Sequence, residues 1–141
     1  MVQDITATLR DSGFKVTPQR LAVYDALTKT KEHPNAEMLY SKLRPHYPTM
    51  SLATVYKTVD ILAKLGLIKV LNTGEDSFRY DADVSDHAHL RCLDCKSVCD
   101  VYDLSTDEIT EEAERKTGYS IASKEIYFFG ACPDCKFEKK N

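Results

Sequence analysis

Four of the five cysteines in this 141-residue chain form two C-x2-C pairs, Cys92 with Cys95 and Cys132 with Cys135. A C-x2-C pair can place two thiolates on one side of a tight turn, and two pairs complete the four-sulfur tetrahedron that Zn2+ prefers. The other interpretation is that these cysteines pack as small buried hydrophobes. Because both pairs lie in turn settings in one half of the chain, we predict a closed structural zinc site with one Zn2+ per chain. Loss of the ion should unfold that half, since metal-binding energy there is folding energy.

The fifth cysteine, Cys99, extends the first pair to C-x2-C-x3-C. It is either a half-buried strand residue, or a reactive thiol or alternative zinc ligand. Both interpretations stay open at this point.

The chain has no long apolar run and no basic-then-apolar leader at its N-terminus. We therefore expect no membrane association and a cytoplasmic location, where cysteines serve as metal ligands rather than disulfides. The net charge is -3 overall. Residues 1–80 carry 11 basic and 8 acidic side chains, whereas residues 81–141 carry 8 and 14. The first half is thus the better candidate for contacting a polyanion.

Helix signals dominate the first half. Thr17 before Pro18, Asn35 and Ser51 each stand where an N-cap residue is expected, and Gly66 ends the last amphipathic pattern. We expect a short helix over residues 3–12, then helices from 18, over 36–43 and over 52–65. Two strands, over 68–70 and 77–80, follow around a turn at 72–74. Helices followed by a hairpin predict a winged helix-turn-helix.

The second half alternates strand and helix. We expect strands over 87–91 and 98–102, a helix opened by a capping box from Ser105 to Glu108, and a strand over 119–129. The acidic segment 82–86 is the predicted hinge. The predicted fold class is α+β, with a winged-helix domain over 1–81 and a small α/β domain over 87–141 that carries the zinc site.

Histidines and carboxylates gather beside the first cysteine pair. His87 and His89 face the same side of a strand, and Asp81, Asp86 and Asp100 lie near them in the chain. A mixed set of imidazoles and carboxylates suits Fe2+, Mn2+ or Zn2+. If His33 from the first half also reaches it, the site joins both domains. The alternative is a group of solvated surface histidines in an acidic hinge.

The helix that begins after Ser51 has a polar face with Thr54 and Lys57, and with Tyr56 toward its side. Short hydroxyls and a longer donor at a helix N-terminus are typical of a recognition helix in the major groove. Arg79 on the wing and Lys15 before the second helix are candidates for phosphate or minor-groove contacts. The alternative is a plain solvated face.

The chain resembles the ferric uptake regulator family over nearly its whole length, and several short segments carry the resemblance. The segments are Gly13–Arg20, His33-Pro34, Ser51–Tyr56, Arg79–Asp81, His87–His89 and the two cysteine pairs. The resemblance implies a homodimeric, metal-dependent repressor that binds a palindromic operator in double-stranded DNA and dimerises through its C-terminal domain. The expected DNA contacts are Lys15, Arg20, Ser51, Thr54, Tyr56 and Lys57.

The peroxide-responsive branch of that family is the most similar. Its regulatory Fe2+ or Mn2+, one per chain, is held by three His and two Asp, and the matching positions are His33, Asp81, His87, His89 and Asp100. The implied mechanism is oxidation of a ligand histidine, His33 or His87, by a species formed from peroxide and Fe2+. DNA is then released. The alternative within the family is an iron- or zinc-uptake regulator, whose members usually carry Glu at the positions of Asp81 and Asp100.

Two positions depart from the family pattern. Lys124 stands where many members have a histidine of an additional metal site, and Lys57 stands where many have arginine. Two other classes of protein are alternatives, a zinc-dependent hydrolase and a zinc-ribbon interaction module. A zinc-dependent hydrolase lacks support because the chain has no H-E-x-x-H motif, so we expect no enzyme activity. In the zinc-ribbon alternative, the first half of the chain binds protein rather than DNA.

Overall fold

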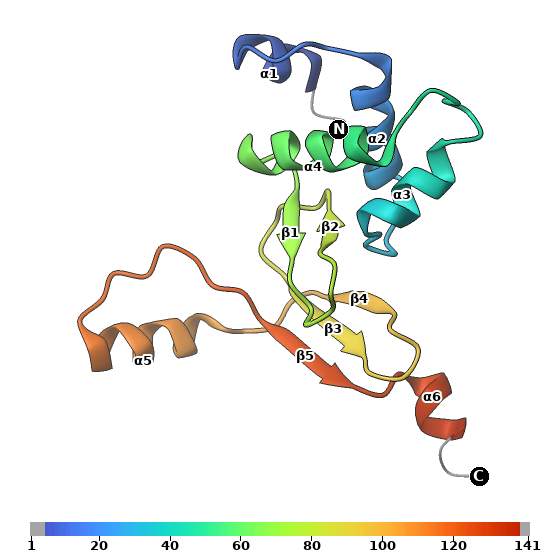
Figure 1. Ribbon diagram of the computed structural model, residues 1–141. Helices are drawn as coiled ribbons and strands as arrows, with labels where there is room; N and C mark the ends of the chain where they lie inside the picture. The colour runs from blue at the N-terminus through green and yellow to red at the C-terminus, as the bar shows by residue number, and fades with distance from the viewer. Residues whose placement is uncertain (1–4, 139–141) are drawn as a thin grey trace. The chain divides into compact units, whose positions relative to one another are not determined.

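The computed structural model describes residues 5–138 and divides the chain into two compact units, Met1–Ser85 and Asp86–Asn141 (Figure 1). Unit 1 contains four helices and a hairpin, and unit 2 contains a small sheet with two helices. The elements in chain order are α1 Ile5–Asp11, α2 Pro18–Thr28, α3 Ala36–Leu43, α4 Leu52–Lys64, β1 Lys69–Leu71, β2 Arg79–Asp81, β3 Ala88–Cys92, β4 Val98–Val101, α5 Asp107–Thr117, β5 Tyr127–Gly130 and α6 Pro133–Glu138.

The helix starts of unit 1 follow from their cap residues, as predicted. The side chains of Thr17, Asn35 and Ser51 accept hydrogen bonds from the backbone N–H groups three residues ahead, which satisfies donors left open at each first turn. Gly66 follows α4 with a φ of 73°, in the left-handed region that glycine adopts without steric cost. Local chemistry therefore sets where these helices begin and end.

Unit 1 has a continuous apolar core. Leu27 of α2, Leu39 of α3 and Val59 of α4 are almost fully buried within it. The wing consists of β1 and β2 in antiparallel register, with Val70 opposite Tyr80, and Tyr80 is buried in the same core. Helices that pack on one core and continue into a hairpin confirm the winged helix-turn-helix.

Unit 2 is built on a three-stranded sheet in the order β4-β3-β5. The central strand β3 is antiparallel to β4 and parallel to β5, so α5 lies in the crossover between β4 and β5 (Figure 1). This mixed arrangement of strand and helix confirms the α+β fold class.

Two local predictions in unit 2 were wrong. Thr106, not Ser105, precedes α5, and it makes no side-chain cap bond, so there is no capping box. The predicted strand over 119–129 is confined to β5, because only Tyr127–Gly130 pairs with β3.

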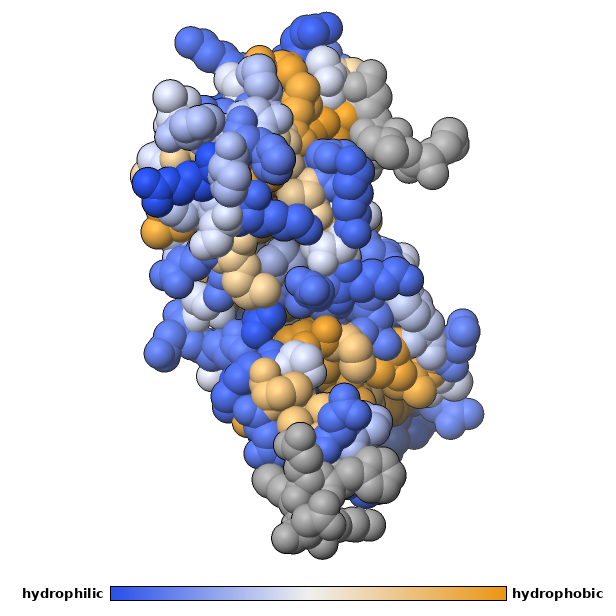
Figure 2. Space-filling view, turned by 90° about the vertical axis from the view of Figure 1, so that its right-hand side faces the viewer, coloured by the Kyte–Doolittle hydropathy of each residue, from blue (hydrophilic) through white to orange (hydrophobic). Residues whose placement is uncertain are grey.

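Unit 2 has little core of its own. Within the described part of unit 2, the buried apolar residues are Ala88, Cys92 and Val98, and no residue of α5 is buried. Several large apolar side chains are exposed instead, among them Ile109, Tyr119 and Phe129. Figure 2 shows apolar patches on a surface that is otherwise mainly hydrophilic. No helix within residues 5–138 is long and apolar enough to cross a membrane.

Candidate metal centres and nucleic-acid surface

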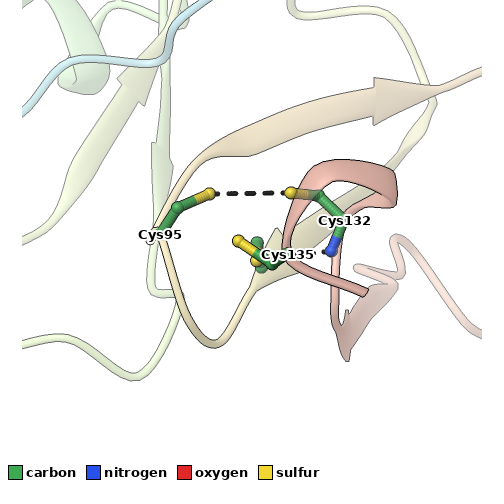
Figure 3. A group of neighbouring side chains, drawn as sticks. Cys95, Cys132 and Cys135 are labelled. Carbon is green, nitrogen blue, oxygen red and sulfur yellow. Dashed lines mark hydrogen bonds between the residues drawn. The ribbon is translucent and has the colours of Figure 1, made fainter. Parts of the chain in front are cut away.

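The two cysteine pairs meet in unit 2. Cys92 ends β3 and Cys95 lies in the turn that follows, while Cys132 and Cys135 flank the start of α6. One sulfur from each of these four residues lies within 4.8 Å of the others. Figure 3 shows the sulfur atoms of Cys95 and Cys132 facing one another, 3.8 Å apart, with Cys135 beside them. Four convergent thiol groups form the donor set of a closed zinc site.

The surroundings favour the thiolate form of two of these cysteines. The backbone N–H of Cys132 donates to the Cys92 sulfur at 3.3 Å, and this bond, with others from the Cys95 and Asp94 backbone, lowers the pKa of Cys92 to about 6. The hydroxyl of Ser97 lies 3.1 Å from the Cys95 sulfur and lowers its pKa. The pKa of Cys135 is raised by its contacts with Cys132 and Cys92. Adjacent thiolates repel one another, so this group fits a cation that neutralises them.

Cys99 lies apart from this group. It is on β4, opposite Leu90 of β3, and its side chain is exposed. The described four-cysteine group does not include it, so Cys99 is neither the half-buried strand residue nor the alternative zinc ligand considered from the sequence.

A second donor group lies across β3 and β4 of the same unit. Asp100 is the cross-strand partner of His89, and one carboxylate oxygen, Oδ1, lies 3.3 Å from His89 Nε2 and 2.9 Å from His87 Nε2. The imidazole of His87 and the ring of His89 are buried. The register sets His89 opposite Asp100, and His87 lies just before β3. Two imidazoles and a carboxylate thus come together, a set that suits Fe2+, Mn2+ or Zn2+.

Two tyrosines hold these imidazoles in place, and the sequence patterns did not reveal them. Tyr102 stacks on His87 with ring centroids 4.7 Å apart, and its hydroxyl donates to Asp100 Oδ2 at 3.5 Å. Tyr127 of β5 stacks on His89 at 5.9 Å. Outer contacts of this kind orient metal-binding side chains.

Unit 1 has a pair of donors of its own. His33 Nδ1 lies 3.6 Å from Asp81 Oδ2, and both side chains are buried. The other carboxylate oxygen, Asp81 Oδ1, accepts a hydrogen bond from the backbone N–H of Asp83 at 2.9 Å. This bond leaves Oδ2 directed to His33.

The expected DNA contacts gather around the N-termini of α2 and α4. Thr54, Lys57 and Arg20 line a groove of about 480 Å3. Tyr56 and Lys57 are exposed. The Arg20 guanidinium donates to the carbonyl of Lys15 at 2.7 Å, and Ser51 is engaged in capping α4. The groove therefore offers cationic and hydroxyl groups along one surface of unit 1, as a phosphate-binding surface does.

Arg79 does not belong to that surface, and its expected role in DNA contact was wrong. Its side chain is 10% exposed and forms a two-pronged ion pair with Glu75. A residue turned inward to this degree cannot reach a phosphate.

Lys124, which departs from the family pattern, lies beside the second donor group. Its ammonium is 3.6 Å from Asp86 Oδ2. A cation supplied by the chain is thus paired with an acidic side chain.

Comparison with known proteins gives a consistent result. The family model described as the ferric uptake regulator family matches residues 11–129. The transcriptional regulator PerR of Clostridium acetobutylicum is 45% identical over 135 residues, 96% of this chain and 98% of that protein. The peroxide operon regulator of Bacillus subtilis is 33% identical over 140 residues, 99% of this chain and 96% of that protein. The crystal structure of the Campylobacter jejuni peroxide stress regulator aligns with a TM-score of 0.71 at 32% identity, over 94% of this chain and all of that one.

Proposed function

The chain belongs to the ferric uptake regulator family, and we propose that it is a metal-dependent, DNA-binding transcriptional repressor that senses hydrogen peroxide. It is a regulator rather than an enzyme, and it acts as a dimer on DNA. The observation that carries the proposal is the convergence of His87, His89 and Asp100 on one point beside a separate four-cysteine group.

The two groups take different metals. Cys92, Cys95, Cys132 and Cys135 hold a structural Zn2+, since four thiolates leave no open position. The regulatory Fe2+ or Mn2+ is bound by His33 and Asp81 from unit 1 with His87, His89 and Asp100 from unit 2. Imidazole and carboxylate donors support this choice of ion.

The regulatory ion couples the two units. Residues 1–81 form the DNA-binding domain, 82–86 the hinge, and 87–141 the dimerisation and metal-binding domain. An ion with donors in both units binds best to one relative arrangement of them, so it shifts the population toward that arrangement. The coupling is reciprocal, because DNA that selects the same arrangement must also tighten metal binding.

DNA recognition belongs to the α2 and α4 surface. Lys15 and Arg20 contact phosphate, and Ser51, Thr54, Tyr56 and Lys57 lie at the end of α4 that enters the major groove. Lys57 presents a single ammonium rather than a planar fork, so it reads a base edge or phosphate without bidentate geometry. A two-fold dimer matches a palindromic operator. A cytoplasmic location follows from the role of a DNA-binding repressor.

Peroxide sensing depends on which ligands surround the ion. Bound Fe2+ supplies the electron that cleaves peroxide. The part played by the chain is to hold the oxidisable imidazoles of His33 and His87 next to that ion. Aspartate at both acidic positions is shorter than glutamate, and this supports a peroxide response over iron or zinc sensing.

A mobility-shift assay with a palindromic duplex tests the repressor function. The zinc-loaded protein should bind the duplex only after Mn2+ or Fe2+ is added. Treatment with peroxide should release DNA from the Fe2+ form and leave the Mn2+ form bound, and mass spectrometry should find one added oxygen atom on His33 or His87. If peroxide adds no oxygen atom to either histidine of the Fe2+ form and the DNA stays bound, peroxide sensing is refuted and an iron- or zinc-uptake regulator is favoured.

A further inference from the structure

The backbone of His33 adopts a conformation that its own sequence disfavours. Its φ is 51°, in the left-handed region that is uncommon for residues with a side chain. The next residue is Pro34, and a residue before proline prefers an extended conformation. Contacts from elsewhere in unit 1 must therefore hold the chain at this position.

Those contacts come from the wing. The guanidinium Nη1 of Arg79 donates to the carbonyl oxygen of His33 at 3.2 Å. The N–H of Tyr80 donates to the carbonyl of Pro34 at 3.0 Å, and the Asn35 side chain donates to Ser77 Oγ at 3.3 Å. Three consecutive residues are thus tied to β2 and the loop before it.

The Arg79 side chain that makes one of these contacts is itself oriented by a second residue, Glu75. Glu75 accepts from Arg79 Nε at 2.9 Å and from Nη2 at 3.1 Å, and both side chains are largely buried, at 15% and 10% exposure. A guanidinium is planar, so fixing two of its nitrogens fixes the direction of the third. Glu75 therefore directs Nη1 at His33.

We propose that Glu75 and Arg79 are positioning residues for His33, and that they set the affinity of the regulatory metal site. This inference rests on the proposed function, which makes His33 a ligand. Without the Glu75–Arg79 pair, His33 relaxes toward the extended conformation favoured before proline, and its Nδ1 leaves the side of Asp81. Lysine at position 79 would keep the charge but lack the fork that engages Glu75 and His33 together.

The experiment measures Mn2+ binding to the zinc-loaded, full-length protein by electron paramagnetic resonance. Arg79→Lys and Glu75→Gln should each weaken Mn2+ binding by about 10- to 100-fold, the usual effect of losing an outer contact to a metal ligand. The double variant should be no weaker than either single variant by more than about 2-fold, because Glu75 acts through Arg79.

Asp25→Asn is the matched control. Asp25 pairs with Lys29 at the same sequence separation and in the same unit, but both side chains of that ion pair are exposed. The Mn2+ affinity of the Asp25→Asn variant should stay within about 2-fold of wild type, because an exposed ion pair contributes little free energy.

A second measurement separates positioning from general destabilisation. In the Fe2+ form treated with peroxide, the ratio of oxidised His33 to oxidised His87 should fall in Glu75→Gln, whereas a global loss of stability leaves the ratio unchanged. An unchanged ratio together with an unchanged Mn2+ affinity in both single variants would overturn the inference.

His33→Ala separates a failure of the proposed ligand set from a failure of the positioning role. If this variant binds Mn2+ as wild type does, His33 is not a ligand, and the proposed ligand set falls together with the inference. If it weakens binding while Arg79→Lys and Glu75→Gln do not, only the positioning role is refuted.

Discussion

Removing zinc should unfold unit 2 and leave unit 1 folded. The perturbation is either a strong chelator under reducing conditions or the variant Cys132→Ser, which removes one thiolate from the four-cysteine group. Unit 1 has its own extensive core, from Leu9 in α1 to Tyr80 in the wing. In the described part of unit 2, by contrast, the buried apolar residues are Ala88, Cys92 and Val98.

The magnitudes favour unfolding. Three buried apolar side chains, at about 1.5–3 kcal/mol for a fully buried large one, contribute less than roughly 10 kcal/mol. Ordering the backbone costs about 1–2 kcal/mol for each residue. A structural Zn2+ contributes about 10–16 kcal/mol at neutral pH, whereas whole domains are stable by only about 5–15 kcal/mol. The free energy lost with the ion is therefore at least as large as the whole free energy of unfolding expected for unit 2.

Hydrogen exchange followed by mass spectrometry resolves the two units. After zinc removal, the amides of β3 and β4 should exchange rapidly, while those of α4 keep their protection. Cys99→Ser is the control, because Cys99 lies outside the described four-cysteine group, and it should retain both zinc and slow exchange in β3. Slow exchange in β3 of the zinc-free protein would show that unit 2 folds without zinc.

Three further results are expected. Asp100→Glu should retain Mn2+-dependent DNA binding but lose most of its peroxide response, since a longer carboxylate crowds the position open to peroxide; undiminished histidine oxidation in this variant would contradict the assignment. Lys57→Ala should make the salt dependence of DNA binding weaker. The magnitude of the slope of log affinity against log salt should fall by about 2 for a dimer that loses one phosphate contact per copy. Lys42→Ala, an exposed lysine on α3, should leave that slope unchanged. Ser51→Ala should destabilise unit 1 by about 1 kcal/mol in urea titration through loss of the α4 cap, and an unchanged midpoint would mean that the cap bond is not formed.

Much of unit 1 could be predicted because its signals are local. Thr17, Asn35 and Ser51 cap helices through bonds to residues three positions ahead, so the information lies within one turn of chain. The C-x2-C pairs could be predicted for the same reason, because both donors of a pair lie within four consecutive residues. Local chemistry of this kind does not depend on the rest of the fold.

Features of unit 2 that depend on distant partners could not be predicted. Residues 119–126 have the composition of a strand, yet the paired register with β3 begins only at Tyr127. The strand propensity of a segment measures how well its side chains pack on a sheet, and pairing is decided by tertiary context. Likewise, nothing in the chain near Tyr102 indicates that its ring stacks on His87.

Arg79 shows how a correct motif can lead to a wrong role. An arginine on a predicted wing suggests a phosphate contact, because arginine side chains are mostly exposed. Glu75, four residues earlier, draws the guanidinium inward, and the same guanidinium reaches the carbonyl of His33, 46 positions before Arg79. Neither contact has a signature in the sequence, since acidic residues near an arginine are common on solvated surfaces.

The distribution of donors between the units explains why one metal is structural and the other regulatory. All four cysteines lie in unit 2, so a Zn2+ there stabilises unit 2 alone and has no direct effect on α4. Under the proposed ligand set, His33 and Asp81 lie in the unit that carries α4, and the remaining donors lie in the other. The free energy that couples metal to DNA can then be no larger than the contribution of those two residues. Glu75 and Arg79 act on one of them, so they set the strength of the response without contacting either the metal or DNA.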